Sequence, residues 1–326
     1  MHDVIARLRQ LDRQGALRLP LPGAGQTAAR HAALFELGRE DLSLARLAEA
    51  HTDAVAIVAE ARLNAPAGAL FGVWASDGPT SWLKLSRTDS GQLRLDGVKR
   101  YCSGAGLLDR ALVTAHEGDV LRLVSVPLAA PGLTIDARDW AAPAFAATST
   151  ATVTFNQVLL EESELVGPSH WYLTRPGFWH GAIGPAACWA GGAAGLVDAA
   201  RVLNRRDPHS RAHLGALEAT EWGMRAVLTQ AGAEIDADPL DAGNEGQRRA
   251  LMARHLIERA CTDLLDRFGR ASGPQLLAFD ADVAQRYAEL TLYIRQCHGE
   301  RDLAQIPDAI AAPTVVSSVA PRAAHG

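Results

Sequence analysis

Two kinds of hydrophobic pattern alternate along the chain, and the pattern changes near residues 66 and 168. Between residues 31 and 63, apolar residues recur every three, four or seven positions, which is the spacing of one face of an α-helix. The pattern stops before Asn64-Ala65-Pro66, because a proline and the residue before it do not continue a helix. These residues therefore predict a helical N-terminal segment.

Residues 70–160 carry a different pattern. Short runs such as SWLKLSR and ATVTFNQVLL alternate apolar and polar side chains or are rich in β-branched residues. Alternation with a period of two predicts strands, and the Gly, Pro, Asp and Ser residues between the runs predict short turns. Many strands in a row without helices favour a small barrel or sandwich.

The helical spacing returns after Gly167-Pro168 and continues to about residue 306. Proline-containing breaks follow at Asp207-Pro208, Asp238-Pro239 and Gly273-Pro274. They leave four predicted helices, over 181–206, 215–235, 245–271 and 279–306. Long consecutive helices with short connections are typical of an antiparallel bundle.

The order of these patterns predicts an α+β fold. We expect a short N-terminal helical domain at residues 1–66, a middle β-barrel at 67–168 and a C-terminal antiparallel four-helix bundle at 169–308. Residues 309–326 show no periodicity and predict a disordered tail. An all-β module between two helical parts is an unusual order and is informative in itself.

Composition narrows the class of protein. The net charge of −5 argues against a nucleic-acid partner, because such proteins usually carry a clustered basic surplus. No apolar run approaches the ~20 residues that span a membrane, and the charged N-terminus does not resemble a secretory signal. The four cysteines are scattered, without zinc-binding spacing, so we expect a reduced, cytoplasmic protein without a metal site.

One predicted strand has an unusual sequence, LDGVKRYCSGAG at residues 95–106. Asp96-Gly97 predicts a turn, and an aromatic residue is followed at once by small polar residues and glycines. A plain hairpin, with Tyr101 in the core and Ser103 in a turn, would explain part of this pattern. A strand that lies against a flat, polar ligand would explain all of it.

The domain order and several segments together resemble the acyl-CoA dehydrogenase family over about residues 35–306. The segments are GREDLSLARLAEAH, LDGVKRYCSGAGLLDRALVTA, TFNQVLLEESELVG, RAHLG and RHLIERACTDLLDRFGRASG. The resemblance implies FAD bound between barrel and bundle, a homodimer or homotetramer, and oxidation of an acyl thioester, either acyl-CoA or a carrier-bound acyl group. Against the family's usual pattern, the N-terminal domain is short.

The resemblance also implies where the cofactor binds. In the family, the strand that matches KRYCSG lies along the flavin, which places Tyr101, Cys102 and Ser103 at the ring, with Ser103 near N5. The strand that matches FGVWASDGP makes Trp74, Ala75 and Ser76 candidates for backbone contacts, although DGPTSW replaces the family's Gly-Ser-Asp loop. The alternative for this second strand is that its residues only fill the barrel.

Two bundle positions match residues that reach the dinucleotide of a neighbouring subunit in the family. Arg211 begins RAHLG, and a guanidinium fork suits a pyrophosphate. Gly269 lies in FGRASG, where the family has a glycine-rich turn. The alternatives are a solvated arginine near a helix start and an ordinary helix end.

The catalytic glutamate of the family is not evident in the matching stretch, AELTLYIRQCHGERD. His298 and Glu300 are the candidates for acid–base chemistry there, since a histidine titrates near neutrality and a carboxylate can take a proton. A surface histidine without a catalytic role is the alternative. Three functions stay open: an acyl-thioester oxidoreductase, a flavin-dependent monooxygenase, and a non-catalytic subunit.

Overall fold

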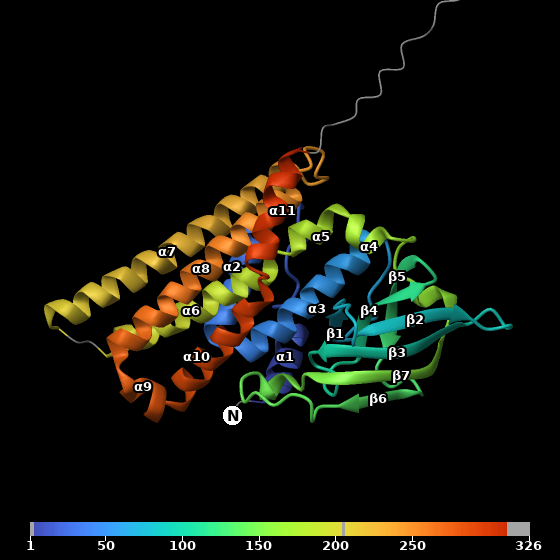
Figure 1. Cartoon of the computed structure of the whole chain (residues 1–326), viewed down its shortest axis with the longest axis horizontal. Helices are drawn as coiled ribbons and strands as arrows, with labels where there is room; N and C mark the ends of the chain where they lie inside the picture. The colour runs from blue at the N-terminus through green and yellow to red at the C-terminus, as the bar shows by residue number, and fades with distance from the viewer. Residues whose placement is uncertain (1–2, 204–205, 312–326) are drawn as a thin grey trace, which may run out of the picture.

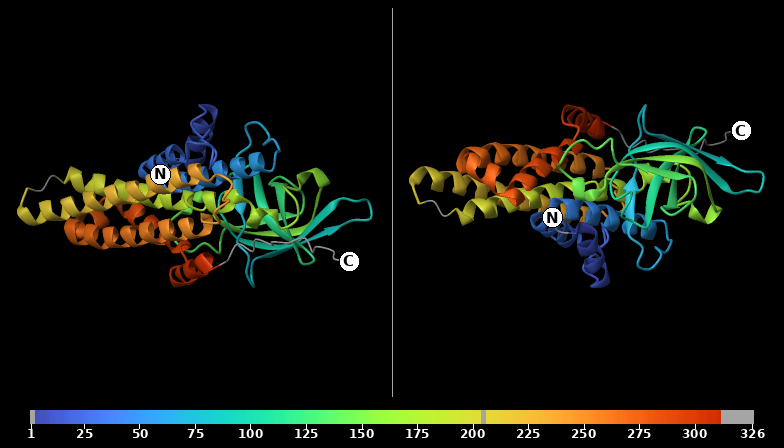
Figure 2. Two further views of the ribbon diagram at one scale, coloured as in Figure 1. Left: turned by 90° about the horizontal axis from the view of Figure 1, so that it is seen from above. Right: turned by 90° about the horizontal axis from the view of Figure 1, so that it is seen from below.

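The computed structural model describes residues 3–203 and 206–311. The molecule is elongated, with a curled sheet at one end and a bundle of long helices at the other (Figures 1 and 2). The helices are α1 Val4–Arg13, α2 Thr27–Glu40, α3 Leu42–Glu60, α4 Trp171–Thr174, α5 Pro176–Gly181, α6 Gly184–Val202, α7 Pro208–Ala237, α8 Gly246–Ser272, α9 Pro274–Phe279, α10 Ala281–Tyr293 and α11 Glu300–Ala311.

The sheet has seven strands in the order β1-β4-β2-β3-β7-β6, and β5 pairs with β4. The strands are β1 Phe71–Trp74, β2 Trp82–Arg87, β3 Leu93–Cys102, β4 Arg110–Glu117, β5 Val120–Pro127, β6 Leu133–Asp136 and β7 Ala151–Leu160. Most neighbours are antiparallel, while β1 and β2 each run parallel to β4. Within the described residues β6 does not pair with β1 or β5, so the sheet is curled but is not the closed barrel that we expected.

The predicted turn at Asp96-Gly97 is absent, because β3 continues through both residues. Its pairing with β7 shifts register between Leu95 and Gly97, which marks a β-bulge. Gly97 has φ 131°, and a Cβ there would lie 2.3 Å from the Trp82 carbonyl oxygen. Glycine is therefore required here by the close approach of the β2 backbone to β3, a role that the sequence does not distinguish from a turn.

Two predicted helices are each divided in the structure. The segment 31–63 forms α2 and α3, because Asp41 is extended and its side chain accepts from the backbone N–H of Leu44 at 2.7 Å, capping α3. The segment 279–306 divides into α10 and α11 around a 3₁₀ turn at Ile294–Gln296. The breaks before Pro208 and Pro274 lie where the sequence predicted them.

Helix α3 lies between the sheet and the bundle (Figure 1). One side packs on β1, and other sides pack on α2, α6 and α10. The bundle core also includes Leu34 and Phe35 of α2, so the N-terminal helices and the bundle share one hydrophobic core. Because α3 contacts both parts of the molecule, its polar residues are held where sheet and helices meet.

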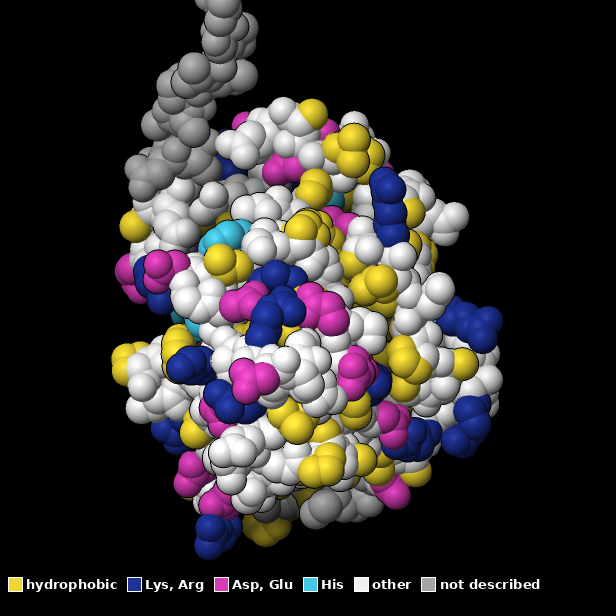
Figure 3. Space-filling view, turned by 90° about the vertical axis from the view of Figure 1, so that its right-hand side faces the viewer, with side chains coloured by type: hydrophobic (Ala, Val, Ile, Leu, Met, Phe, Trp, Pro, Cys, Tyr) yellow, Lys and Arg dark blue, Asp and Glu magenta, His cyan; other side chains and the backbone are white. Residues whose placement is uncertain are grey.

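The surface at the sheet end carries interspersed Lys, Arg, Asp and Glu side chains rather than a patch of one sign (Figure 3). No helix among residues 3–203 and 206–311 is long and apolar enough to cross a membrane. Most of the predicted tail, from residue 312, lies outside the described residues.

Candidate functional site

The structure brings several of the predicted strand residues together at the end of the sheet that faces α3. Trp74 ends β1, and its indole N–H donates to the Ser103 carbonyl oxygen at 3.1 Å. Tyr101 has φ 61° and its side chain is 62% exposed. Cys102 differs, because it is fully buried in the sheet core and its thiol lies 3.4 Å from the Lys99 carbonyl oxygen.

Ser103 takes part in a chain of hydrogen-bonded hydroxyl groups, which fixes the direction of its own hydrogen bond. Thr148 Oγ1 donates to the Phe145 carbonyl oxygen at 2.8 Å, so it accepts from Thr150 Oγ1, also at 2.8 Å. Since each hydroxyl has one proton, Ser103 Oγ donates to Thr150 at 3.2 Å. Arg46 Nε donates to Ser103 Oγ at 2.8 Å, and the Ser103 backbone N–H donates to the Tyr101 carbonyl oxygen at 3.0 Å. Both donors of Ser103 are therefore engaged inside the protein.

The loop after β1 is held by a buried lysine. Lys99 is fully buried, and its ammonium group donates to the Ser76 carbonyl oxygen at 3.1 Å and to the Asp77 carboxylate. Ser81 Oγ donates to the same carbonyl oxygen at 2.9 Å. Ala75 packs on the apolar cluster behind β1, and Ser76 is exposed. A loop without the expected Gly-Ser-Asp sequence is thus fixed by side chains.

The two bundle candidates lie elsewhere. Arg211 is exposed in the first turn of α7, and Gly269 is half-buried near the end of α8. Both helices pack against each other and against α6, on the part of the molecule away from the sheet (Figure 1). A single chain therefore does not bring Arg211 or Gly269 to the Trp74–Ser103 region.

The two catalytic candidates lie at the start of α11: Glu300 is its first residue, and His298 comes two residues earlier. His298 is 54% exposed at its side chain, and its Nδ1 lies 3.2 Å from Asp302 Oδ1. Its backbone N–H donates to the same carboxylate at 3.0 Å, and Glu300 is exposed in the first turn. These contacts are local and are typical of the N-terminus of a helix.

A row of charged residues on α3 was missed by the sequence analysis. Arg46, Glu49 and Asp53 are spaced by three and four residues, so they share one face of the helix. The side chains of Glu49 and Asp53 keep some accessible surface, but their carboxyl groups make no hydrogen bond or ion pair with the described part of the chain. Two unpaired carboxylates on one buried helix face are unusual, because a buried charge is normally paired.

The arginines around these carboxylates donate to other groups. Arg30 donates to the Pro20 carbonyl oxygen at 3.2 Å. Arg254 donates to the Ala182 carbonyl oxygen at 2.7 Å and lies over the Trp189 ring. Arg46 lies over the Phe145 ring at 4.8 Å, besides its bond to Ser103. The arginines therefore act on the two carboxyl groups only through longer-range electrostatics. Both carboxyl groups stay available to bind a ligand.

Burial strongly perturbs the acid–base behaviour of this face. Burial and the charge of Asp53 raise the pKa of Glu49 to about 8, although three nearby arginines favour its ionised form. Burial also raises the pKa of Asp53, against the charges of Arg175 and Arg30. At neutral pH the Glu49 carboxyl therefore holds a proton, and it can release that proton within the physiological range.

Glycines at the end of α5 and the start of α6 leave space for the two carboxyl groups of α3. A Cβ at Gly181 would lie 2.7 Å from Asp53 Oδ1, and one at Gly184 would lie 3.0 Å from Glu49 Oε1. Both glycines belong to a glycine-rich segment, residues 177–195, whose composition alone is equally typical of closely packed helices. The missed signal was the pairing of a charged stripe on one buried helix with glycines on another.

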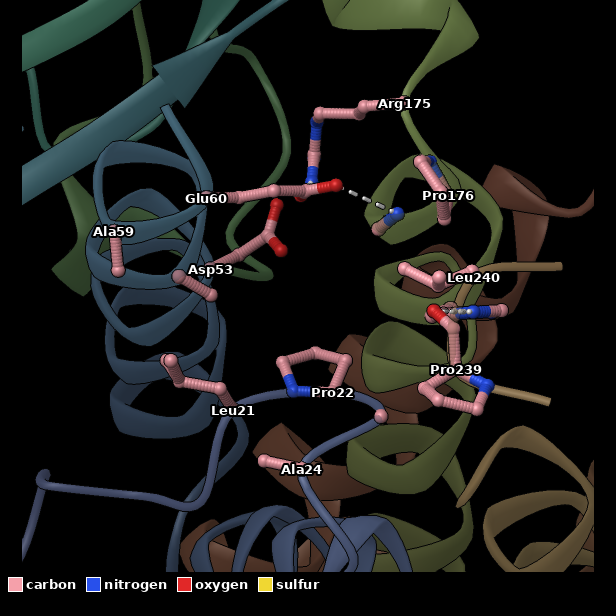
Figure 4. Close-up of a pocket in the computed structure, with 14 residues that line it drawn as sticks. Leu21, Pro22, Ala24, Asp53, Ala59, Glu60, Arg175, Pro176, Pro239 and Leu240 are labelled. Carbon is pink, nitrogen blue, oxygen red and sulfur yellow. Dashed lines mark hydrogen bonds and ion pairs between the residues drawn. The ribbon is translucent and has the colours of Figure 1, made fainter. Parts of the chain in front are cut away.

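Near Asp53 the space widens into a cavity of about 330 Å³ between α3 and α5 (Figure 4). Asp53 and Glu60 extend from α3, and Arg175 reaches toward Glu60 from the opposite side (Figure 4). Arg175 Nη1 pairs with Glu60 Oε2 at 2.5 Å. The charged face of α3 thus runs from the sheet junction at Arg46 to this cavity.

No family model matches the chain, and no curated protein matches it in sequence. Solved structures do resemble it over nearly its whole length, and they have the acyl-CoA dehydrogenase-like fold. A nitrososynthase from Micromonospora carbonacea var. africana is 18% identical with a TM-score of 0.79, over 95% of this chain and 94% of that one. The likeness extends through the short N-terminal helical part as well.

Two further structures are monooxygenases. TdsC, a dibenzothiophene monooxygenase from Paenibacillus sp. A11-2 solved with FMN and indole, has 15% identity and a TM-score of 0.75, over 94% of both chains. Methanesulfinate monooxygenase MsuC from Pseudomonas fluorescens has 19% identity and a TM-score of 0.71, over 94% of both chains. At these identities the likeness establishes the fold of this chain and nothing finer.

Proposed function

We propose that the protein is a flavin-dependent oxidoreductase of the monooxygenase type, with its reaction centre beside the charged face of α3. The observation that carries the proposal is the unpaired Glu49 carboxyl on α3, which faces Gly184 of α6 and whose pKa burial raises to about 8. The structural neighbours, two of which are monooxygenases and one of which holds FMN, support this class of reaction. They also favour FMN as the flavin to test before the FAD that the sequence suggested.

The residues at the end of β3 fit a planar ring. Tyr101 presents an aromatic side chain that is 62% exposed, from a left-handed conformation that costs a non-glycine residue free energy. Stacking on that ring and donors from the Ser76 loop would hold a flavin there. Ser103 contributes indirectly, by fixing Arg46. The bound flavin would supply the two electrons that activate oxygen.

Glu49 supplies the proton chemistry in this proposal. When one oxygen atom of O₂ enters a substrate, the other leaves as water and must take up protons. A carboxyl with a pKa of about 8 holds a proton at pH 7 and can donate it to that oxygen. Arg46 and Arg254 would then stabilise the carboxylate that remains.

A dehydrogenase acting on an acyl thioester needs an ionised base in place of such an acid. Near the junction of α10 and α11, Glu289 is buried and already accepts from Ser43 Oγ at 2.7 Å and the Phe145 backbone N–H at 3.2 Å. Glu300 is exposed at the start of α11. Neither is free inside the site, so the thioester reaction has less support. A role for His298 stays a prediction.

Flavin binding tests the proposal first. We expect titration with FMN, followed by flavin fluorescence, to show binding by the parent protein. Tyr101→Ala should weaken it about tenfold through lost stacking. Trp222→Ala, which removes a 74% exposed aromatic ring from α7, should bind FMN as the parent does.

Isotope labelling then separates the candidate reactions. With reduced FMN, ¹⁸O₂ and indole as a probe, a monooxygenase would give a labelled product. Bleaching of the oxidised, flavin-loaded protein by acyl-CoA without oxygen would instead support the thioester oxidoreductase. A parent protein that binds neither FMN nor FAD would refute both and indicate a non-catalytic subunit.

A further inference from the structure

The cavity between α3 and α5 has the size and walls of a small-molecule site. Its volume of about 330 Å³ is at the lower end of the range for such sites. Leu21 and Leu240, which are 40% and 77% exposed, stand at the rim. Much of the wall is apolar, from Leu21, Pro22, Ala56, Ala59, Pro239 and Leu240.

One carboxyl group in this wall has no direct partner. Glu60 is neutralised by Arg175 at 2.5 Å and also accepts from the Gly177 backbone N–H at 3.1 Å. Asp53 keeps accessible surface, and its carboxyl group makes no hydrogen bond or ion pair with the described residues. Arg30 lies near Asp53, but it donates to Pro20 and Thr52 instead. A ligand that brings a positive charge would complete the pairing.

A second group in the wall also lacks a partner. His180 is 2% exposed, and its Nε2 lies 3.2 Å from the Pro239 carbonyl oxygen. A carbonyl only accepts, so Nε2 carries the proton and Nδ1 is the acceptor of the neutral ring. Burial lowers the pKa of His180, which favours that neutral form. Nδ1 has no hydrogen-bond partner within the described residues.

We propose that this cavity binds a small protonated amine that carries a second hydrogen-bond donor. Its ammonium group lies against the Asp53 carboxylate, and its second donor reaches His180 Nδ1. Its apolar body contacts the Leu21 and Leu240 side of the wall. Arg175 Nε in the same wall is a donor without a partner, but that guanidinium already pairs with Glu60 through Nη1. The Asp53 carboxyl, which has no such pairing, therefore favours a cation over an anion. The inference concerns binding alone and does not require a flavin.

Matched ligands test the proposal on the flavin-free protein by isothermal titration calorimetry. trans-4-Aminocyclohexanol carries both groups, cyclohexylamine lacks the second donor, and cyclohexane-1,4-diol lacks the charge. We expect the amino alcohol to bind best, the amine to bind several-fold more weakly, and the diol at least tenfold more weakly. A diol that binds as tightly as the amino alcohol would overturn the proposal, as would a parent protein that binds none of the three.

A pair of variants locates the binding. Asp53→Asn should weaken the amino alcohol at least tenfold, while Asp263→Asn, on the exposed face of α8, should bind it as the parent does. Unchanged binding by a folded Asp53→Asn protein would refute the assignment. If Asp53→Asn does not fold, the three ligands on the parent decide. Binding of FMN without amine binding sinks this inference alone, whereas amine binding without FMN sinks only the flavin proposal.

Discussion

At the scale of single residues, the raised pKa of Glu49 predicts how the free energy of unfolding changes with pH, with a definite sign. Its carboxyl has an ordinary pKa of 4.5 in an unfolded chain and about 8 in the folded protein. Between these pH values the folded state keeps a proton that the unfolded chain has lost, so the free energy of unfolding falls as pH rises. The fall is at most about 1.4 kcal/mol per pH unit for one proton.

Glu49→Gln should therefore flatten the decline in stability between pH 5 and pH 8, and the variant should be more stable than the parent at pH 8. Urea unfolding at four pH values measures this. Glu161→Gln provides the control, because Glu161 is exposed and accepts from Gln92 outside the site. An equal slope for parent and Glu49→Gln would show that the carboxyl is not protonated in the folded protein.

At the scale of elements, α3 depends on a cap that also sets the position of the site. The Asp41 side chain accepts from the Leu44 backbone N–H at 2.7 Å, at the break between α2 and α3. Asp41→Ala should cost about 1 kcal/mol in the free energy of unfolding, and Asp41→Asn should cost much less. Asp89→Ala, in an exposed turn, should change stability by less than about 0.5 kcal/mol. Equal losses for Asp41→Ala and Asp89→Ala would refute the capping role.

The same element shows what periodicity could and could not reveal. Apolar spacing correctly predicted helix on both sides of Asp41, but a capping aspartate inside a continuous pattern looks like a polar surface position. The charged stripe of Arg46, Glu49 and Asp53 has the spacing of an ordinary solvated face. Only the packing of α3 between sheet and bundle turns that stripe inward, and that packing involves residues over 100 positions away.

At the scale of the whole molecule, the order of helices, strands and helices could be predicted, because each part has its own hydrophobic period over many residues. The β-bulge at Gly97 could not be predicted, since a glycine occurs both in turns and where two paired strands approach closely. Of the predicted cofactor residues, Trp74 and Ser103 do lie in contact, while their role in binding a cofactor stays a prediction. Arg46 and the two carboxylates were missed, because their burial depends on contacts between distant segments.

Arg46 joins the two halves of the molecule, which yields the last prediction. It donates to Ser103 of the sheet end at 2.8 Å and lies over the Phe145 and Tyr293 rings at 4.8 and 5.3 Å. Arg46→Met keeps the apolar stem but removes the guanidinium. The loss of a hydrogen bond to a charged donor should cost about 1.5–3 kcal/mol in the free energy of unfolding, measured with urea.

Arg225→Met is the matched control for Arg46→Met. Arg225 also covers an aromatic ring, at 3.7 Å from Phe35, but its side chain is 38% exposed and it connects two helices within one core. Solvent screening makes its loss smaller, below about 1 kcal/mol. Because sheet and bundle meet at Arg46, tryptophan fluorescence and far-ultraviolet circular dichroism should both report the larger loss in Arg46→Met. If the two variants lose equal stability, Arg46 is an ordinary surface arginine and the junction is held by apolar packing alone.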